Sequence, residues 1–274
     1  MPFRPLLLAL GLAALPGPSP AAGVGTRVAL APAPDAPAVA RLRTVQRDGQ
    51  FDVHVRNLTA GPIEIELGFA QAENMRSLPP LPLRQVLHAG EERLVAGLAA
   101  ADGGRPARHR LALLAVPGTP DAAPVDVEYL RPFEGPVRIA QGWHGAFSHG
   151  TDEARYAIDF ALPPGTPVRA ARDGRVVQVE SGFHEAGLDP ALASRANIVR
   201  VLHDDGSMAL YAHLAPDGIR VGPGDHVAAG SVLGLSGDTG YSSGPHLHFA
   251  VQVNRGLRLV SLPFRMRGFE VVEE

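Results

Sequence analysis

The chain has no cysteine, no lysine and few aromatic residues, which make up 5% of its 274 positions. Without cysteine, neither a disulfide framework nor a lipid anchor on a cysteine can form. Because all 25 basic residues are arginine, any mechanism that needs a lysine amine is excluded. The formal net charge of -3 gives no basic footprint for nucleic acid. No apolar run reaches the roughly 20 residues that a membrane-spanning helix requires.

The first 22 residues have the pattern of a secretory signal peptide. Arg4 gives a short positive region, residues 6–15 form an apolar core, and small residues lead to a cleavage site near Ala22. The apolar core is too short for an ordinary membrane span. We therefore expect an exported bacterial protein, periplasmic or extracellular, with no membrane span in its mature form.

Residues 23–122 are predicted to form a lead-in rich in alanine and proline, followed by a small β-sandwich. Phe51–Val55 and Ile63–Leu67 alternate in polarity on either side of an Asn/Gly/Pro segment, which predicts a hairpin. Further short apolar runs up to about residue 115 fit the other strands of a sandwich. A linker rich in Pro, Ala and Asp follows at residues 117–124.

Residues 125–274 are predicted to form a second domain, in which short strands alternate with glycine-containing turns. Residues 197–202 and 208–214 flank Asp204-Asp205-Gly206, a sequence that favours a tight hairpin. Amphipathic helical periodicity is scarce here, and we expect a single short helical turn within residues 190–196. The fold class predicted for the whole chain is therefore all-β with two domains.

A pair of histidines near the C-terminus stands out, in the sequence Gly244-Pro245-His246-Leu247-His248-Phe249. Side chains alternate along a strand, so His246 and His248 point the same way while Leu247 and Phe249 point the other way. A buried strand has no packing reason to place two imidazoles side by side. A metal ion provides one, because neutral imidazole is a preferred ligand of zinc.

Three further polar positions complete the constellation. Asp159 lies in Tyr156-Ala157-Ile158-Asp159-Phe160-Ala161, where it shares a face with two alanines. A carboxylate on such an apolar strand is costly unless it is paired or binds a metal, and its small neighbours leave room for an ion. His149 begins the loop that leads into this strand, and His213 ends the strand after the predicted hairpin.

These motifs, in this order, resemble the M23 zinc endopeptidases, also called LytM-like or lysostaphin-like. The resemblance rests on His149 and Asp159, on Tyr211-Ala212-His213-Leu214 and on the Gly244–Phe249 motif, and it covers about residues 135–265. It implies a LytM-like antiparallel β-sheet with Zn²⁺ held by His149, Asp159 and His248. His213 and His246 then correspond to the family's two histidines beside the metal-bound water. One helps to deprotonate this water, and the other orients it or stabilises the developing oxyanion.

One departure concerns the spacing of the first two ligands. Many family members place the histidine and the aspartate four residues apart, whereas His149 and Asp159 are ten apart. Glu153 satisfies the shorter spacing and Asp152 comes near it, but both lie in a polar loop and are expected to face solvent. His144 is the rival of His149.

Several other residues carry weaker expectations. His144, next to Trp143, is expected to form a wall of the cleft rather than to bind the metal. Three histidines in predicted turns are expected at the surface: His184, His203 and His226. For Tyr241-Ser242-Ser243 two interpretations stay open, a cleft lining and a solvated loop tip, and the same holds for Asn197.

The resemblance implies an exported endopeptidase that hydrolyses the peptide cross-links of bacterial peptidoglycan through a zinc-activated water, with stem peptides as substrate. The first domain would position the enzyme, contact cell-wall or divisome proteins, or cover the cleft. The alternative is a LytM-like protein without enzymatic activity that activates cell-wall amidases, although all five site positions are retained here. A lipoyl- or biotinyl-carrier is excluded, because such carriers need a lysine.

Overall fold

The computed structural model describes residues 39–268 as a succession of short β-strands with a single short 3-10 helix. The predicted signal peptide and most of the lead-in lie outside these residues. Within residues 39–268, no helix is long and apolar enough to cross a membrane. The succession of strands with one short 3-10 helix confirms the all-β prediction.

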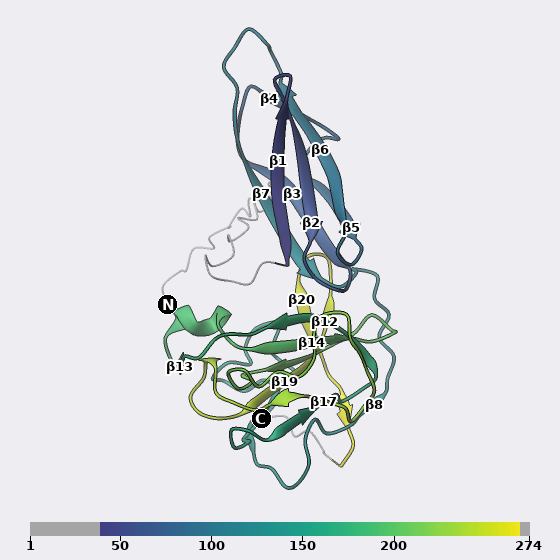
Figure 1. Ribbon diagram of the computed structural model, residues 1–274, viewed down its shortest axis with the longest axis vertical. Coiled ribbons are helices and arrows are strands. Elements are labelled where there is room, and N and C mark those ends of the chain that lie inside the picture. Colours follow the sequence, from purple (N-terminus) through teal and green to yellow (C-terminus); the bar gives the residue numbers. More distant parts are fainter. Residues whose placement is uncertain (1–38, 269–274) are drawn as a thin grey trace, which may run out of the picture. The chain divides into compact units, whose positions relative to one another are not determined.

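The first part of the chain is a sandwich of two antiparallel sheets (Figure 1). Their inner faces bury one cluster of aliphatic side chains, among which Val53, Ile65 and Leu87 are completely buried. In strand order, one sheet holds β1 (Ala40–Arg47), β2 (Gln50–Asn57), β6 (Glu92–Ala100) and β4 (Met75–Leu78), and the other holds β5 (Leu83–Leu87), β3 (Ile63–Glu73) and β7 (Arg108–Pro117). The predicted β-sandwich is confirmed.

The hairpin predicted between Phe51–Val55 and Ile63–Leu67 is wrong. β2 pairs with β1 and β6, whereas β3 pairs with β5 and β7, so the two segments lie in different sheets. The connection between them is organised by the buried Asn57, whose amide donates to the carbonyls of Gly61 and His88 and accepts from the backbone of Thr59. The first hairpin of this sandwich instead turns at Asp48-Gly49, where both φ angles are positive, as an Asp-Gly hairpin turn requires.

The second part of the chain is built on a larger antiparallel sheet. The hairpin predicted around Asp204-Asp205-Gly206 is confirmed, since Arg200 pairs with Leu210 across it. In strand order the sheet holds β16 (His226–Val227), β12 (Gly174–Glu180), β14 (Ile198–Leu202), β15 (Met208–Ala212), β19 (Leu247–Asn254), β10 (Ile158–Phe160) and β9 (Ile139–Gln141), with β20 (Leu259–Leu262) also paired to β19.

Short elements complete this part of the chain. The 3-10 helix η1 (Pro190–Ser194) confirms the predicted helical turn; the Asp189 side chain accepts from its first free N–H, on Ala191. The remaining strands form three pairs: β11 (Pro167–Arg169) with β17 (Val232–Leu235), β13 (Ala186–Gly187) with β18 (Gly240–Tyr241), and β8 (Glu128–Tyr129) with β21 (Arg265–Met266).

The two faces of the large sheet differ sharply in character. One face packs the hydrophobic core, with Phe160, Tyr211 and Phe249 completely buried. Because strand side chains alternate, the intervening residues, including Asp159 and His248, project from the opposite face. All the polar groups considered next belong to that second face or to the loops beside it.

Candidate active site

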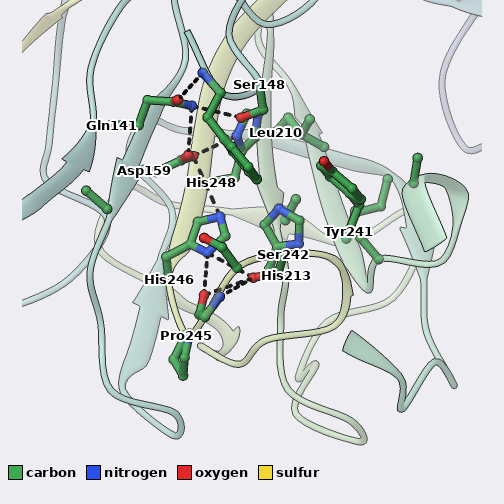
Figure 2. Close-up of a pocket in the computed structure, with 18 of the residues that line it drawn as sticks. Gln141, Ser148, Asp159, Leu210, His213, Tyr241, Ser242, Pro245, His246 and His248 are labelled. Atoms are coloured by element: carbon green, nitrogen blue, oxygen red, sulfur yellow. Dashed lines mark hydrogen bonds and ion pairs between the residues drawn. The ribbon is translucent and has the colours of Figure 1, made fainter. Parts of the chain in front are cut away.

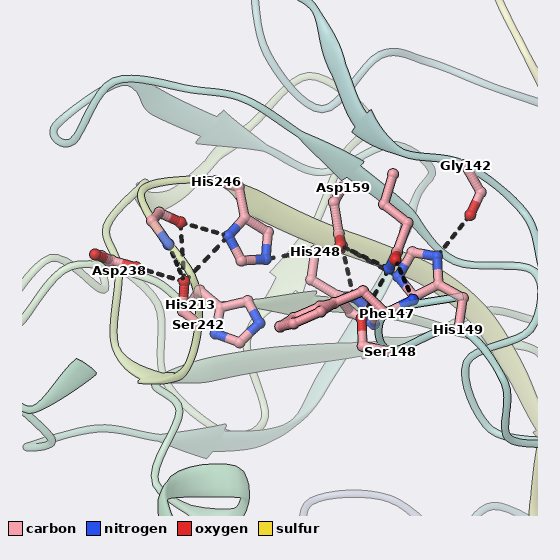
Figure 3. Close-up of polar contacts among 12 residues, drawn as sticks. Gly142, Phe147, Ser148, His149, Asp159, His213, Asp238, Ser242, His246 and His248 are labelled. Atoms are coloured by element: carbon pink, nitrogen blue, oxygen red, sulfur yellow. Dashed lines mark hydrogen bonds and ion pairs between the residues drawn. The ribbon is translucent and has the colours of Figure 1, made fainter. Parts of the chain in front are cut away.

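Two neighbouring strands and one loop bring three predicted ligands together. Asp159 in β10 lies directly opposite His248 in β19, so strand pairing alone places the carboxylate beside the imidazole. His149 reaches the same point from the loop between β9 and β10. One ligand atom from each of the three residues lies within 4.8 Å of the others (Figure 3).

Asp159 is the centre of this cluster. Its Oδ1 lies 2.8 Å from His248 Nδ1 and 3.3 Å from His149 Nε2. Burial by itself would raise the pKa of Asp159, but the close contacts with the imidazoles of His149 and His248 outweigh it and hold this pKa well below its usual range. The carboxyl group is therefore ionised and available as a ligand at neutral pH.

The proton arrangement of His149 tests whether these residues fit a metal. His149 is completely buried, and its Nδ1–H donates to the carbonyl of Gly142 at 2.7 Å, because a carbonyl oxygen can only accept (Figure 3). In the neutral ring, Nε2 therefore carries a lone pair that faces the Asp159 carboxylate. Two such groups need a proton or a cation between them. Histidines that bind a metal through one ring nitrogen are oriented by a hydrogen bond from the other, as the bond from His149 Nδ1–H to Gly142 would do here.

The chemistry of the donor set agrees with zinc. Two histidines and one carboxylate are three ligands that leave a fourth position for water or substrate, as in catalytic rather than structural zinc sites. His248 and Asp159 are each about nine-tenths buried, which limits competition from bulk water. The residues present therefore fit a zinc ion.

His213 and His246 flank the cluster with their rings 4.4 Å apart between centroids. The Nδ1–H of His213 donates to the Thr239 carbonyl and that of His246 to the Gly244 carbonyl, each at 2.7 Å. In both neutral rings the lone pair is therefore on Nε2, and His246 Nε2 lies 3.8 Å from Asp159 Oδ1. Both histidines can thus accept a proton beside the cluster.

His213 is held in an unusual state. Its backbone has a φ of +62°, in the left-handed region that residues other than glycine rarely adopt. Burial lowers the pKa of His213 to about 3, and the neighbouring His246 and His248 act in the same direction. The ring is therefore neutral at physiological pH.

Gln141 is a site residue that the sequence analysis missed. It lies in β9 opposite Asp159, and its amide donates to Asp159 Oδ2 at 3.3 Å and to Ser148 Oγ at 2.8 Å. Its carbonyl oxygen accepts from the backbone N–H of Phe147 at 3.0 Å (Figures 2 and 3). One side chain thus fixes the carboxylate and the loop that carries His149. Nothing in the sequence near Gln141 signals this role, which depends on strand pairing.

Asp159 and His248, together with His213 and His246, line a cavity of about 740 Å³. Tyr241-Ser242-Ser243 could have been a cleft lining or a solvated loop tip. They are a cleft lining, because all three residues line this cavity. The ring of Tyr241 stacks on that of Phe147, with 5.8 Å between centroids and 11° between planes. Asn197 is instead completely buried, and its amide binds the carbonyls of Phe183 and Leu214.

The rivals for the ligand positions lie outside the cluster. His144 packs its ring against Tyr156, and Asp152 forms ion pairs with Arg155 and Arg258. Glu153, expected to face solvent, lines the cavity but does not join the three clustered ligands.

Two expectations about nearby residues are wrong. His144 does not line the cavity of the cluster; its ring packs against Tyr156, as does that of the neighbouring Trp143. His203 is buried rather than at the surface, because its Nδ1 binds the Asp173 carbonyl at 2.7 Å and its ring packs on Tyr129. A turn histidine can therefore be drawn into the core by one backbone partner.

Comparison with known proteins gives a family for this region. Residues 153–258 match the profile of Peptidase family M23. This stretch holds Asp159, His213, His246 and His248, and His149 lies just ahead of it.

Two relatives and one solved structure illustrate the similarity. Glycyl-glycine endopeptidase ALE-1 of Staphylococcus capitis is 40% identical over 100 residues, which are 36% of this chain and 25% of that protein. Peptidoglycan DD-endopeptidase ShyA of Vibrio cholerae is 40% identical over 95 residues, 35% of this chain and 19% of that protein. A catalytic-domain structure of the prophage-encoded M23 protein EnpA from Enterococcus faecalis matches with a TM-score of 0.38 and 27% identity, covering 49% of this chain and 94% of that chain. The similarity thus spans a quarter or less of these two relatives' length.

Proposed function

Because the C-terminal part of the chain carries an M23 peptidase domain, we propose that the protein is a zinc-dependent endopeptidase that hydrolyses peptide cross-links of bacterial peptidoglycan. The observation that carries the proposal is the cluster of His149, Asp159 and His248, with the lone pairs of His213 and His246 beside it. Four of these five groups line one cavity, and His149 lies directly behind Asp159.

The proposed ligands are His149 through Nε2, Asp159 through Oδ1 and His248 through Nδ1. A zinc ion held there would act as a Lewis acid on water and on the scissile carbonyl. The Gly142 carbonyl fixes the ring of His149, and Gln141 fixes the second oxygen of Asp159, so the three ligand atoms stay directed at one point.

The proposed catalytic residues are His213 and His246. One of them accepts the proton of the attacking water at Nε2 and returns it to the leaving amine, as a general base and then a general acid. The other orients the water or stabilises the negative charge on the carbonyl oxygen. Carbonyl acceptors at Nδ1 hold both rings in the required tautomer.

The substrate class follows from the relatives' names, glycyl-glycine endopeptidase and peptidoglycan DD-endopeptidase. In an organism with direct cross-links the bond cleaved would be the one between D-alanine and the diamino acid; a glycine bridge is the other target. Such a substrate lies outside the cytoplasm, so we also propose that the protein is exported. That the sandwich of residues 40–117 binds a cell-wall or divisome partner stays a prediction.

The test is digestion of purified peptidoglycan by the full chain, followed by mass spectrometry of the released peptides. We expect separated stem peptides, and the masses would identify the bond that is cut. The His248→Ala variant is the control, because it removes one proposed ligand. Digestion by neither protein, together with unchanged cellular function of His248→Ala, would favour the amidase activator instead.

A further inference from the structure

An arginine lies in the floor of the same cavity, away from the proposed zinc ligands. Arg200 is in β14, where Val199 and Val201 point into the core, so its side chain belongs to the face that carries His248. It lies opposite Leu210 in β15, which lies opposite Ala250 in β19. Arg200 is therefore two strands away from β19, and His248 lies two residues along β19 from Ala250. These spacings put the Cα atoms of Arg200 and His248 about 12 Å apart.

Arg200 is a buried charge without a carboxylate partner. Its relative exposure is 4%, yet it lines the cavity. Its Nε–H donates to the Gln178 amide oxygen at 3.2 Å, and Nη1 donates to that of Gln252. None of the ion pairs among residues 39–268 includes Arg200, and Glu153 and Glu180 influence it only through space. A charge in such a place is costly unless it is paired.

A purely structural role does not account for the charge. The two glutamines are held in turn, because Gln178 donates to Glu180 and Gln252 donates to the carbonyl of Glu153. The arginine therefore ties three strands together, but these contacts use two of the five N–H donors of a guanidinium. A neutral side chain could bridge the same two amide oxygens without the cost of burying a charge.

We propose that Arg200 is the anion subsite of the cavity and binds a free carboxylate of the peptide substrate. The inference rests on the proposed peptidase function and adds a substrate requirement to it. Because an extended peptide advances about 3.4 Å per residue, the carboxylate would lie about three or four residues from the bond that is cut. Leu210, which pairs with Arg200, and the small Ala212, which pairs with His248, both line the cavity, so it is continuous between the two positions.

The experiment compares two synthetic cross-linked stem peptides that differ only in having free carboxylates or carboxamides. Their binding to the full chain is measured by competition against a fluorescent peptide, and their cleavage by chromatography. We expect the carboxylate form to bind about tenfold or more tightly, which is the range for a hydrogen bond to a charged group. In Arg200→Gln the ratio of the two affinities should fall to about one, and Arg200→Lys should keep part of the preference.

The matched control is Arg175→Gln, which removes an exposed arginine of the adjacent strand β12 that does not line the cavity. It should keep the full preference. Equal binding of the two peptides by the unmodified protein would overturn the subsite, even if Arg200→Gln failed to fold. A preference that survives in a folded Arg200→Gln variant would do the same. A binding preference without cleavage would instead contradict the peptidase function and leave the subsite in place.

Discussion

Gln141 offers the sharpest test of how this site is held together. The Gln141→Met substitution keeps the volume of the side chain but removes its hydrogen bonds to Asp159, Ser148 and the backbone of Phe147. Gln141 is 8% exposed, so water cannot easily replace these bonds. We expect the Asp159 carboxylate and the loop of His149 to lose their fixed orientation.

The magnitude follows from the number and kind of these contacts. A partner that orients a metal ligand is typically worth 10- to 100-fold in metal affinity, or about 1.4 to 2.8 kcal/mol. Two neutral hydrogen bonds and one to a carboxylate also predict a loss of about 2.5 to 6 kcal/mol in the free energy of unfolding.

The assay is a zinc competition titration against a chromophoric chelator, with urea unfolding of the same samples. Ser148→Ala is the matched control, because it removes one partner of Gln141 but leaves the contact with Asp159. It should change zinc affinity by less than about threefold. An unchanged zinc affinity in a folded Gln141→Met protein would refute the positioning role.

Three further predictions concern other parts of the same domain. His213→Ala should keep one zinc per chain by metal analysis but lose about 100-fold or more in turnover. The control His144→Ala should keep both the zinc and the turnover. Loss of the metal from His213→Ala would contradict the catalytic role of His213. Although burial opposes it, the hydrogen bond from Arg172 lowers the pKa of Asp205. The resulting stabilisation is fully present above the unfolded value of about 3.9 and is lost progressively as the pH falls from there through the lower folded value. Asp205→Asn should therefore lower the urea midpoint more at pH 7 than at pH 2, and an equal loss at both would argue against the ion pair. Gly240→Ala should cost about 2 kcal/mol or more in thermal unfolding, because φ is +88° and a Cβ would lie 2.8 Å from backbone atoms of a neighbouring loop; an unchanged melting temperature would contradict this.

The clustering of the predicted ligands could be anticipated because it depends on local rules. Alternation along a strand put His246 and His248 on one face, and it separated Asp159 from the core residues around it. The structure adds the cross-strand register of Asp159 with His248, which brings the two motifs into contact.

What the sequence did not reveal depends on partners far along the chain. The segments Phe51–Val55 and Ile63–Leu67 look like a hairpin, but they lie in different sheets. The side chain of Asn57 between them binds the nearby carbonyl of Gly61 and the distant carbonyl of His88. Gln141 and Arg200 are ordinary residues in the sequence. Their roles depend on strand pairing, which places Gln141 opposite Asp159 in β10 and Arg200 opposite Leu210 in β15.

The most direct test of the central claim is zinc reconstitution of the chelated full chain. Peptidoglycan cleavage is measured as zinc is added back, while circular dichroism follows the β-fold. We predict that cleavage is absent without zinc and rises to a plateau at one ion per chain, with little change in circular dichroism. Cleavage that persists in the chelated protein, or loss of the β-fold with the metal, would contradict a catalytic zinc at His149, Asp159 and His248.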